Sequence, residues 1–555
     1  MQPDDVRNGR LPVLIAALGC ALLALAVLLP PEIDPAAAAA CKVILAGAAC
    51  LLALEAGHRP VFLPSWSWGL LPFAVVSIAA AACGVRALDE ASDAMALVLA
   101  ALIGRRLASE PRARDALVGL LVTLACVAAL RAAMQHHLIY PIEARAVRAG
   151  AEDGSALLLA RLEAGRPSGP FTLPAALGGF LAMTLPLTLS LVRRAPRWNA
   201  RALMVMAFLL QGYALFLTRS VGALLVTAVS VVLSLPRLAP RHSVRLRTVV
   251  LVLAIAGAAF FLYARRVEIG SPGADPFILR AGNWRAAAHM IRDHPLFGTG
   301  PGSFGTFYPR YIEPGMNETR YAHNSYLQVA AGWGIWALVP LALLAAAVGR
   351  RLRSAWRTGR EDLPLLAAGA AFLVHNLVDF TAFLPGVALP ASVLLGVGLG
   401  PVPGGNRTAR PWQAGLALVV ALALPAHAIA SALSRMSLER AQAAAVDGDT
   451  EGALRLARQA ARCRPADPSP PAFIAEWVLA HGMADAGLHE EGERAAQRAA
   501  ALDPESAIRH YTVSLYAAAA SRPAEASREL RLAHRLYPRK ELYLPAPRPS
   551  APEGR

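Results

Sequence analysis

Long, almost uninterrupted apolar runs dominate residues 1–433 of this chain. A run of roughly 20 apolar residues is what a helix needs to cross a bilayer core of about 30 Å. We count about thirteen runs that suit one crossing each. They lie near residues 11–30, 36–54, 64–83, 91–108, 115–134, 171–192, 200–218, 221–236, 247–263, 324–348, 363–383, 386–402 and 412–433. The pattern predicts an all-α fold, a polytopic membrane helix bundle of about 13 spans.

The positions of the basic residues orient this bundle. The net charge of +16 would suit a nucleic-acid partner, but Lys occurs only at Lys42 and Lys540. The other basic residues are Arg, and they gather in short loops, which the positive-inside rule makes cytoplasmic. These loops lie near 105–114, 193–201, 237–247, 350–360 and 407–410. The long loops at 135–170 and 264–323 then face outside, the periplasm of a bacterium with two membranes. The N-terminus is cytoplasmic, and an odd number of spans places the C-terminal region outside.

Residues 434–545 differ in kind, because they are polar and rich in Ala, Arg and Glu. Small residues recur, and Pro465, Pro504 and Pro538 are spaced by 39 and then 34 residues. This pattern predicts a soluble α-helical domain of about two to three tetratricopeptide-like helix pairs. A generic bundle of helical hairpins is the alternative. We expect the domain to bind an acceptor protein or an assembly partner, and the Pro-rich tail 546–555 to be disordered.

Metal and nucleotide chemistry find little support in the sequence. Asp447-Gly-Asp449 resembles the metal pair of nucleotide-sugar transferases, but it precedes a predicted helix, so we interpret it as a turn and helix cap. The Gly-rich stretch Gly298-Thr-Gly300 lacks the Lys-Ser/Thr of a nucleotide-binding loop and lies outside, where ATP is scarce. The 6 Cys residues form no framework. We therefore expect neither a metal site nor a cofactor.

The most specific pattern lies in the outer loop that precedes residue 324. It reads Arg280-Ala-Gly-Asn-Trp284, then Pro295-Leu-Phe-Gly298-Thr-Gly300-Pro-Gly-Ser-Phe304, then His323-Asn324-Ser-Tyr-Leu327. These elements resemble, in order and spacing, the signature of the O-antigen ligase and O-antigen polymerase superfamily. Upstream, Arg166-Pro-Ser-Gly-Pro-Phe171-Thr-Leu-Pro174 is similar to a further family motif, and so is Val374-His-Asn-Leu-Val-Asp379-Phe downstream. The resemblance covers roughly residues 160–400.

The chain departs from this signature at three places. Ala175 stands where the family often has Asn, and Gly332 where it often has Glu. Arg219 is displaced by two residues from the position of the family's Arg. These departures affect the subtype more than the superfamily.

The resemblance implies an undecaprenyl-diphosphate-linked glycan as donor and a metal-independent glycosyltransferase mechanism. A leaving diphosphate is already a stable anion, so it needs cationic clamping and no general acid. Arg166, Arg219 and Arg280 all map to the outer side and can supply that clamp. His323, at the start of a helix at the membrane interface, suits the role of base for an acceptor hydroxyl. We assign substrate-binding roles to Asn324, Gly298, Gly300 and Asp379.

Each of these residues also has a structural interpretation. A lone interfacial His is usually structural, and Arg at the edge of a span is commonly a snorkelling anchor. His375 and Asp379 lie in an apolar run, where charge is costly and marks function by default, but the two can simply pair with each other.

Several functions remain open at this stage. The acceptor could be lipid A core, as for a ligase in lipopolysaccharide biosynthesis, another lipid-linked glycan, as for an O-antigen or exopolysaccharide polymerase, or a protein, as for an O-oligosaccharyltransferase. A lipid-glycan transporter is a rival from another class, and it should show ionisable or broken segments in related halves of the bundle. A scaffolding role would leave the outer-loop motif unexplained. We therefore predict a multi-pass enzyme of the bacterial inner membrane that transfers a glycan on its periplasmic face.

Overall fold

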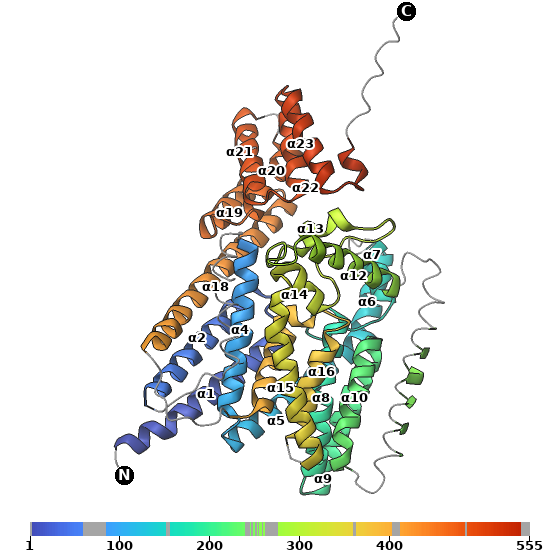
Figure 1. Ribbon diagram of the computed structural model, residues 1–555. Helices are drawn as coiled ribbons and strands as arrows, with labels where there is room; N and C mark the ends of the chain where they lie inside the picture. Colours follow the sequence, from blue (N-terminus) through green and yellow to red (C-terminus); the bar gives the residue numbers. More distant parts are fainter. Residues whose placement is uncertain are drawn as a thin grey trace, which may run out of the picture.

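The computed structural model describes residues 3–58, 85–150, 156–238, 276–358, 362–401, 411–482 and 485–544, with isolated helical residues between 245 and 263. Every regular element in these ranges is a helix, which confirms the all-α class. Long helices form one bundle, and the C-terminal helices stack on one end of it (Figure 1).

Three groups of helices follow one another in space. The bundle contains α1 (Pro3–Leu28), α2 (Pro35–His58), α4 (Val85–Leu107), α5 (Pro111–Met134), α8 (Pro174–Arg194), α9 (Trp198–Thr218), α10 (Val221–Leu238), α15 (Leu338–Thr358), α16 (Leu363–His375), α17 (Pro385–Leu399) and α18 (Pro411–Val446). Shorter elements cover the end of the bundle on which the C-terminal helices stack, which we call the outer end after its predicted side of the membrane. They are a π-helical turn (Gln135–Ile139), α6 (Tyr140–Arg148), α7 (Ala156–Glu163), α12 (Pro276–Asp293), α13 (Phe304–Tyr311) and α14 (Ser325–Trp333), with 3-10 turns at Ile335–Ala337 and Thr381–Phe383. The C-terminal group is α19 (Thr450–Cys463), α20 (Ser469–His481), α21 (Ala486–Leu502), α22 (Ala507–Ala519) and α23 (Pro523–Leu536), followed by a 3-10 turn at Glu541–Tyr543.

Five segments in the described part of the chain are long and apolar enough to cross a membrane. They are Pro35–Leu52, Pro111–Arg148, Pro174–Arg194, Trp198–Thr218 and Ile335–Thr358. Four shorter apolar helices accompany them, Pro12–Leu28, Val221–Ser234, Leu363–His375 and Pro385–Leu399. The protein is therefore a multi-pass membrane protein. The predicted span 64–83 and most of 247–263 lie outside the described residues, and the count of about thirteen spans stays a prediction.

Two predicted spans are broken, because local contacts outweigh their apolar composition. The run 324–348 divides at Gly334, whose φ of +88° ends α14 where it packs against the backbone of Leu296. The run 363–383 stops being helical at His375. Beyond it, the side chain of Asn376 accepts a hydrogen bond from the backbone N of Ala382 (2.8 Å), so a polar side chain supports the irregular segment.

The outer segment 135–170, predicted as a loop, is helical over much of its length. The π-helical turn at Gln135–Ile139 continues α5 into α6 with no break. The sequence analysis missed this continuation because residues 135–148 are more polar than α5. A search for apolar runs ends each predicted helix where its apolar residues end.

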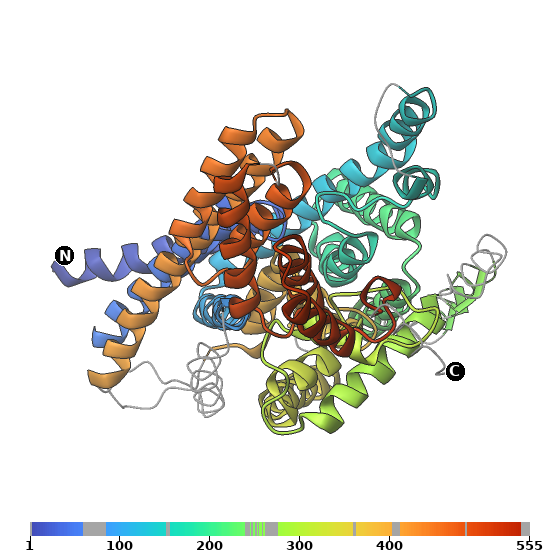
Figure 2. The same ribbon diagram turned by 90° about the horizontal axis from the view of Figure 1, so that it is seen from above.

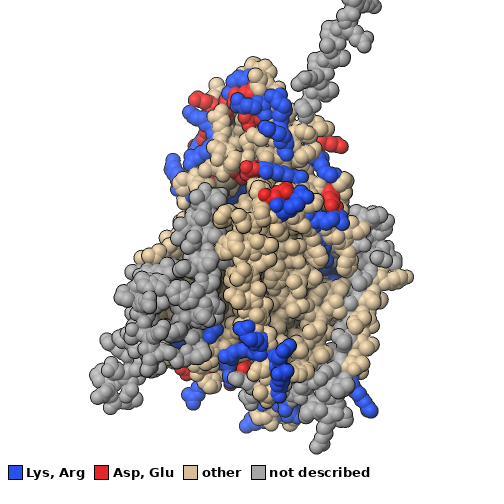
Figure 3. Space-filling view, viewed as in Figure 1, with Lys and Arg blue, Asp and Glu red and all other residues tan. Residues whose placement is uncertain are grey.

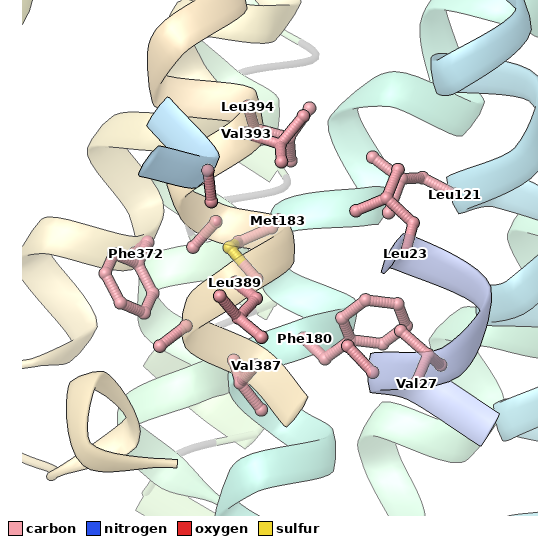
Figure 4. Packing of buried hydrophobic residues seen from close by; sticks show 14 of the residues in the cluster. Leu23, Val27, Leu121, Phe180, Met183, Phe372, Val387, Leu389, Val393 and Leu394 are labelled. Carbon is pink, nitrogen blue, oxygen red and sulfur yellow. The ribbon is translucent and has the colours of Figure 1, made fainter. Parts of the chain in front are cut away.

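Close backbone approach holds the centre of the bundle together. In α4 and α17, Gly104 lies against the carbonyl of Val393, and Gly396 lies against the carbonyl of Ala101. Small residues at such crossings are the usual basis of helix packing in membranes. Larger apolar side chains from α1, α5, α8, α16 and α17, among them Phe180 and Leu389, fill the space beside this crossing (Figure 4).

The C-terminal helices pack in successive pairs: α18 packs against α19, α20 against α21 and α22 against α23. Small residues that the sequence placed at helix contacts, Ala453, Ala460, Ala499 and Ala533, are buried. The tetratricopeptide-like interpretation goes beyond this pairing and stays a prediction. The proposed boundary at residues 433 and 434 falls inside α18, which runs on from the bundle. The predicted disordered tail 546–555 lies outside the described residues.

Asp449 has the capping role that we expected. Its side chain accepts a hydrogen bond from the backbone N of Gly452 (2.9 Å) at the start of α19. Gly448 before it has φ +79°, which suits a turn.

Ion pairs join the C-terminal helices to the outer end of the bundle. Arg86 of α4 makes a two-pronged contact with Asp503 (2.7 and 3.1 Å), and Arg310 of α13 pairs with Glu505. Seen from above, the C-terminal helices lie over the bundle (Figure 2). Charged side chains gather at the two ends of the molecule, with a largely uncharged band between them on the visible face (Figure 3). Such a band is typical of a membrane-embedded surface.

Candidate active site at the outer end of the bundle

The candidate site lies where α12 and α14 meet the broken end of α16. Arg280 comes from α12, His323 lies just before the N-cap residue of α14, and Asp379 follows α16. The sequence separates these residues widely, but both Arg280 and Asp379 act electrostatically on the imidazole of His323. The structure thus brings together three residues that the sequence singled out.

His323 has an unusual backbone and an orphaned ring nitrogen. Its φ of +53° is left-handed, which is uncommon for a residue other than Gly. Among the described residues, no hydrogen-bond partner faces its buried Nδ1, and none faces the buried Nε of Arg280. Burial lowers the pKa of His323 below its ordinary value of 6.5, Asp379 acts to raise it, and Arg280 lowers it. The imidazole is therefore held neutral, the form in which it can accept a proton.

Aromatic side chains fix the position of His323. The ring of Phe380 meets the imidazole edge-on, with 4.8 Å between centroids, and stacks on Tyr321 at 4.2 Å. The indole N–H of Trp284 donates to the backbone carbonyl of His323 (3.3 Å). Trp284 and Phe380 belong to stretches that the sequence analysis matched to family motifs. The stacking of Tyr321 on Phe380 is visible only in the fold.

Arg166 lies against the end of α9, next to Arg219 in the chain. The Nε of Arg166 donates to the backbone carbonyl of Thr218 (3.0 Å), the residue before Arg219. Arg219 itself ends α9 with a left-handed φ of +50°. Although the sequence displaces Arg219 from the family position, the fold places it beside Arg166.

The π-helical turn holds the segment that carries Arg166. Gln135 accepts hydrogen bonds from the backbone N of Ser168 (3.1 Å) and of Gly169 (2.7 Å), and its own amide donates to the carbonyl of Gly169 (3.0 Å). His136 contacts the carbonyl of Gly165 at 2.6 Å. Single π-helical turns inside α-helices frequently mark functional sites. The sequence analysis missed Gln135, because the residue lies outside any motif.

Asn324 serves as the N-cap of α14. Its side-chain oxygen accepts from the backbone N of Tyr326 (3.0 Å) and of Leu327 (3.1 Å). The next residue, Ser325, donates from its hydroxyl to Asn376 (2.6 Å), which joins the start of α14 to the end of α16. This arrangement gives Asn324 a positioning role, because its oxygen already holds the helix that carries His323.

Gly298 and Gly300 pack against the C-terminal end of α14. Gly298 has φ +65°, and a Cβ there would collide with the backbone of Gly332. The backbone N of Thr299 donates to Ala331 (2.8 Å), and that of Gly300 to Gly332 (3.0 Å). The glycines allow this close contact, which clamps α14 at the end opposite to His323.

Asp379 is buried and partly satisfied by the backbone. One carboxylate oxygen accepts from the backbone N of Phe380 (2.7 Å), and the Asp379 carbonyl accepts from the backbone N of Ser325 (3.1 Å). His375 lies against Gly179 of α8 rather than in a close pair with Asp379; a Cβ on Gly179 would lie 3.0 Å from its ring. Asp379 therefore has a charge role toward His323 and a structural role toward α14.

In the described part of the chain, no group of three or more His, Cys, Asp or Glu side chains is arranged to hold a metal ion. The charges available for an anionic ligand are those of the arginines.

Fold and site together define a multi-pass membrane protein with a cationic, His-containing site at the outer end of its bundle. Residues 204–342 match the family model described as O-Antigen ligase. This segment includes Arg219, Arg280 and His323, whereas Arg166, Asp379 and the C-terminal helices lie beyond it. No curated protein and no solved structure matches the chain. The activity that the similarity implies is membrane glycan transfer from a lipid-linked substrate.

Proposed function

We propose that the protein transfers an undecaprenyl-diphosphate-linked glycan to an acceptor hydroxyl on the periplasmic face of the bacterial inner membrane. The observation that carries this proposal is that Arg280 and Asp379 both act electrostatically on a partly buried His323 whose pKa burial lowers, while Arg166 is bonded to the end of the helix that leads into Arg219. A site with fixed cations and a neutral base suits an anionic leaving group and a neutral nucleophile.

The proposed reaction is a direct displacement that needs no metal ion. Arg166, Arg219 and Arg280 hold the diphosphate, and His323 removes the proton of the acceptor hydroxyl. The acceptor oxygen then bonds to the anomeric carbon while the bond from that carbon to the diphosphate oxygen breaks. Undecaprenyl diphosphate leaves as an anion, the proton stays on His323, and the configuration at the anomeric carbon inverts.

A purified-protein assay tests this function. His323→Ala should abolish transfer, by on the order of 10²–10⁴ in rate, with donor binding nearly normal. Arg280→Ala should lower donor affinity and rate together, and Arg280→Lys should restore them only partly, because an ammonium cannot make a bidentate contact. Full activity of His323→Ala would remove this residue from the mechanism, and loss of wild-type activity with a chelator would overturn the metal-free reaction.

The same variants separate the enzyme from a lipid-glycan transporter. A defective transferase lets the lipid-linked donor accumulate on the outer leaflet, whereas a defective transporter keeps it on the inner leaflet. The glycan that accumulates in cells with His323→Ala also distinguishes a ligase, a polymerase and a protein O-oligosaccharyltransferase.

A further inference from the structure

At the outer end of the bundle, a small hydrophobic cluster joins the segments that carry Arg280 and His323. Its buried members lie on α12, α13 and α14 and on the connection between α13 and α14: Ala286, Ala287, Met290, Phe304, Phe307, Tyr308, Ile312, Ala322 and Ala331. Arg280 lies on α12, and His323 directly follows Ala322. The packing of this cluster, which we call the outer cluster, therefore sets where Arg280 and His323 lie relative to each other.

The C-terminal domain contacts the outer cluster through Tyr537. This residue directly follows α23, and its side chain packs both against the outer cluster and against the cluster that holds α22 to α23. Its hydroxyl donates to a carboxylate oxygen of Glu318 (3.0 Å), and the ammonium group of Lys540 donates to the same oxygen (3.0 Å). Glu318 lies shortly before His323 in the chain. The C-terminal domain thus holds the segment that leads to the candidate base.

A short turn between α21 and α22 holds the beginning of the same segment. Here α13 lies beneath α23 (Figure 1) and packs against it. Glu505 in the turn pairs with Arg310 of α13. Asp503, also in the turn, accepts two hydrogen bonds from the guanidinium of Arg86 in α4 (2.7 and 3.1 Å). The C-terminal domain therefore holds residues 304–322 near both of their ends.

These contacts are exposed and polar, in contrast to the contact that joins the domain to the bundle at α19. The side chains of Lys540 and Glu318 are 44% and 57% exposed, and ion pairs of this kind contribute little and are screened by salt. The side chain of Arg464, at the end of α19, is only 6% exposed and contacts Asp89 of α4 (2.9 Å). The far end of the domain can therefore separate from residues 304–322 while α18 and α19 stay in place.

We propose that α22, α23 and the turn before α22 form a clamp on residues 304–322, and that the closed clamp positions His323 for transfer. The charged side chains of the clamp are positioning residues, which act on the reaction through the outer cluster. When the clamp opens, the outer cluster loses its contact with Tyr537, and the segment before His323 becomes mobile. Transfer then slows while the bundle stays folded. The effect on transfer rests on the proposed function, whereas the clamp itself does not.

A charge swap between α13 and the turn tests the clamp. Hydrogen exchange of the backbone amides in residues 304–322 is measured on the full-length protein in lipid nanodiscs. Arg310→Glu and Glu505→Arg should each raise the exchange rate about five-fold, because a partly exposed ion pair becomes a repulsion. The double variant should restore the wild-type rate, and exchange in α8 and α17 should stay unchanged in every variant. Unchanged exchange of residues 304–322 in both single variants overturns the proposal.

An exposed ion pair elsewhere in the domain provides a matched control. Arg494 pairs with Glu490 within α21 (3.1 Å), so Arg494→Glu should leave the exchange of residues 304–322 unchanged. Lys540→Glu and Glu318→Lys form a second, independent swap, whose double variant should again exchange as the wild type does. If neither double variant restores the wild-type rate, or if the control raises the rate equally, the proposal fails.

Transfer kinetics connect the clamp to the reaction. Arg310→Glu should lower kcat about five-fold and leave KM for the lipid-linked donor nearly unchanged, because α9 and the π-helical turn hold Arg166 independently of the clamp. Adding Glu505→Arg should restore kcat. The same kcat in all variants while exchange differs, or a raised KM with kcat unchanged, overturns the positioning role. If the exchange differences hold and the wild-type protein transfers no glycan, the clamp stands and the proposed function fails.

Discussion

Backbone strain marks two of the candidate residues. Among the described residues other than Gly, left-handed φ values occur at Arg219, His323 and Ser521. Such conformations cost about 1–3 kcal/mol each and persist where the surrounding structure imposes them, often at functional sites. At His323 that structure consists of the Trp284 contact, the Phe380 ring and the capped start of α14. The strain supports the assignment of both residues to the site.

The burial of His323 predicts the pH dependence of transfer. Because burial lowers its pKa below 6.5, the base form predominates at pH 7 and is lost as the pH falls through the lowered pKa. The acidic limb of kcat/KM should therefore have its midpoint below pH 6.5. Since Asp379 acts to raise this pKa, Asp379→Asn should move the midpoint to still lower pH. A midpoint above 6.5, or a shift upward in Asp379→Asn, would contradict the assignment of His323 as the base.

The capping geometry of Asn324 predicts which substitutions the site tolerates. Asn324→Ala removes the cap of α14 and should cost about 1 kcal/mol of stability, with lower transfer because His323 is displaced. Asn324→Ser retains a capping oxygen and should keep most of both. Thermal unfolding and transfer rate measured on the same preparations check this. If Asn324→Ser loses transfer as Asn324→Ala does while remaining as stable as wild type, the side chain contacts substrate directly.

At the scale of helices, the candidate site depends on helix ends that lie inside apolar runs of the sequence. An analysis of apolar composition alone does not reveal them. The irregular segment before α14, which carries His323, lies against the irregular segment that follows the end of α16 at His375. Asn376 and Ser325 join these two segments through their side chains. Irregular backbone at membrane depth persists only where protein groups satisfy it. These breaks are therefore what allows His323 and Asp379 to approach each other.

The crossing of α4 and α17 predicts a strong response to a small substitution. Gly396→Leu places a side chain into the backbone of Ala101, so α17 must move away and the bundle should lose stability by several kcal/mol. Gly119→Leu in α5 is the matched control, since nothing lies within 4 Å of a Cβ there. Melting temperature and yield of folded protein in detergent report the difference. Equal stability of the two variants would show that the crossing does not hold the bundle.

At the scale of the whole molecule, charge and topology set which end faces outside. Lys and Arg side chains gather at the end of the bundle opposite to the C-terminal helices, and also around those helices (Figure 3). Alkaline phosphatase fused after residue 544 should therefore be active, and a fusion after Arg353 should be inactive. Green fluorescent protein at the same positions should give the reverse result. Activity after Arg353 would invert the bundle and move the site to the cytoplasm.

The C-terminal helices are joined to the bundle by several ion pairs and form part of a cavity wall. Arg310 and Glu505 join α13 to the C-terminal domain, next to the outer segments that carry the candidate site. We expected these helices to bind an acceptor protein or an assembly partner. Arg509 and Lys540 also line a cavity that reaches α4.

The sequence alone determined the all-α class, the membrane location and the segment that carries the site. Membrane helices satisfy their own backbone, so apolar composition suffices to recognise them. The motif residues around His323 are close in the chain, and their spacing is therefore visible in it. Tertiary structure decided what depends on contacts between distant segments: the approach of Asp379 and Arg280 to His323, the support of Arg166 by Gln135, and the capping and packing roles of Asn324 and Gly298. It also formed a cavity of about 1360 Å³ whose walls include α2, α4, α15, α17, α18 and the C-terminal helices. No local pattern specifies such a space, because it exists only once those helices have packed.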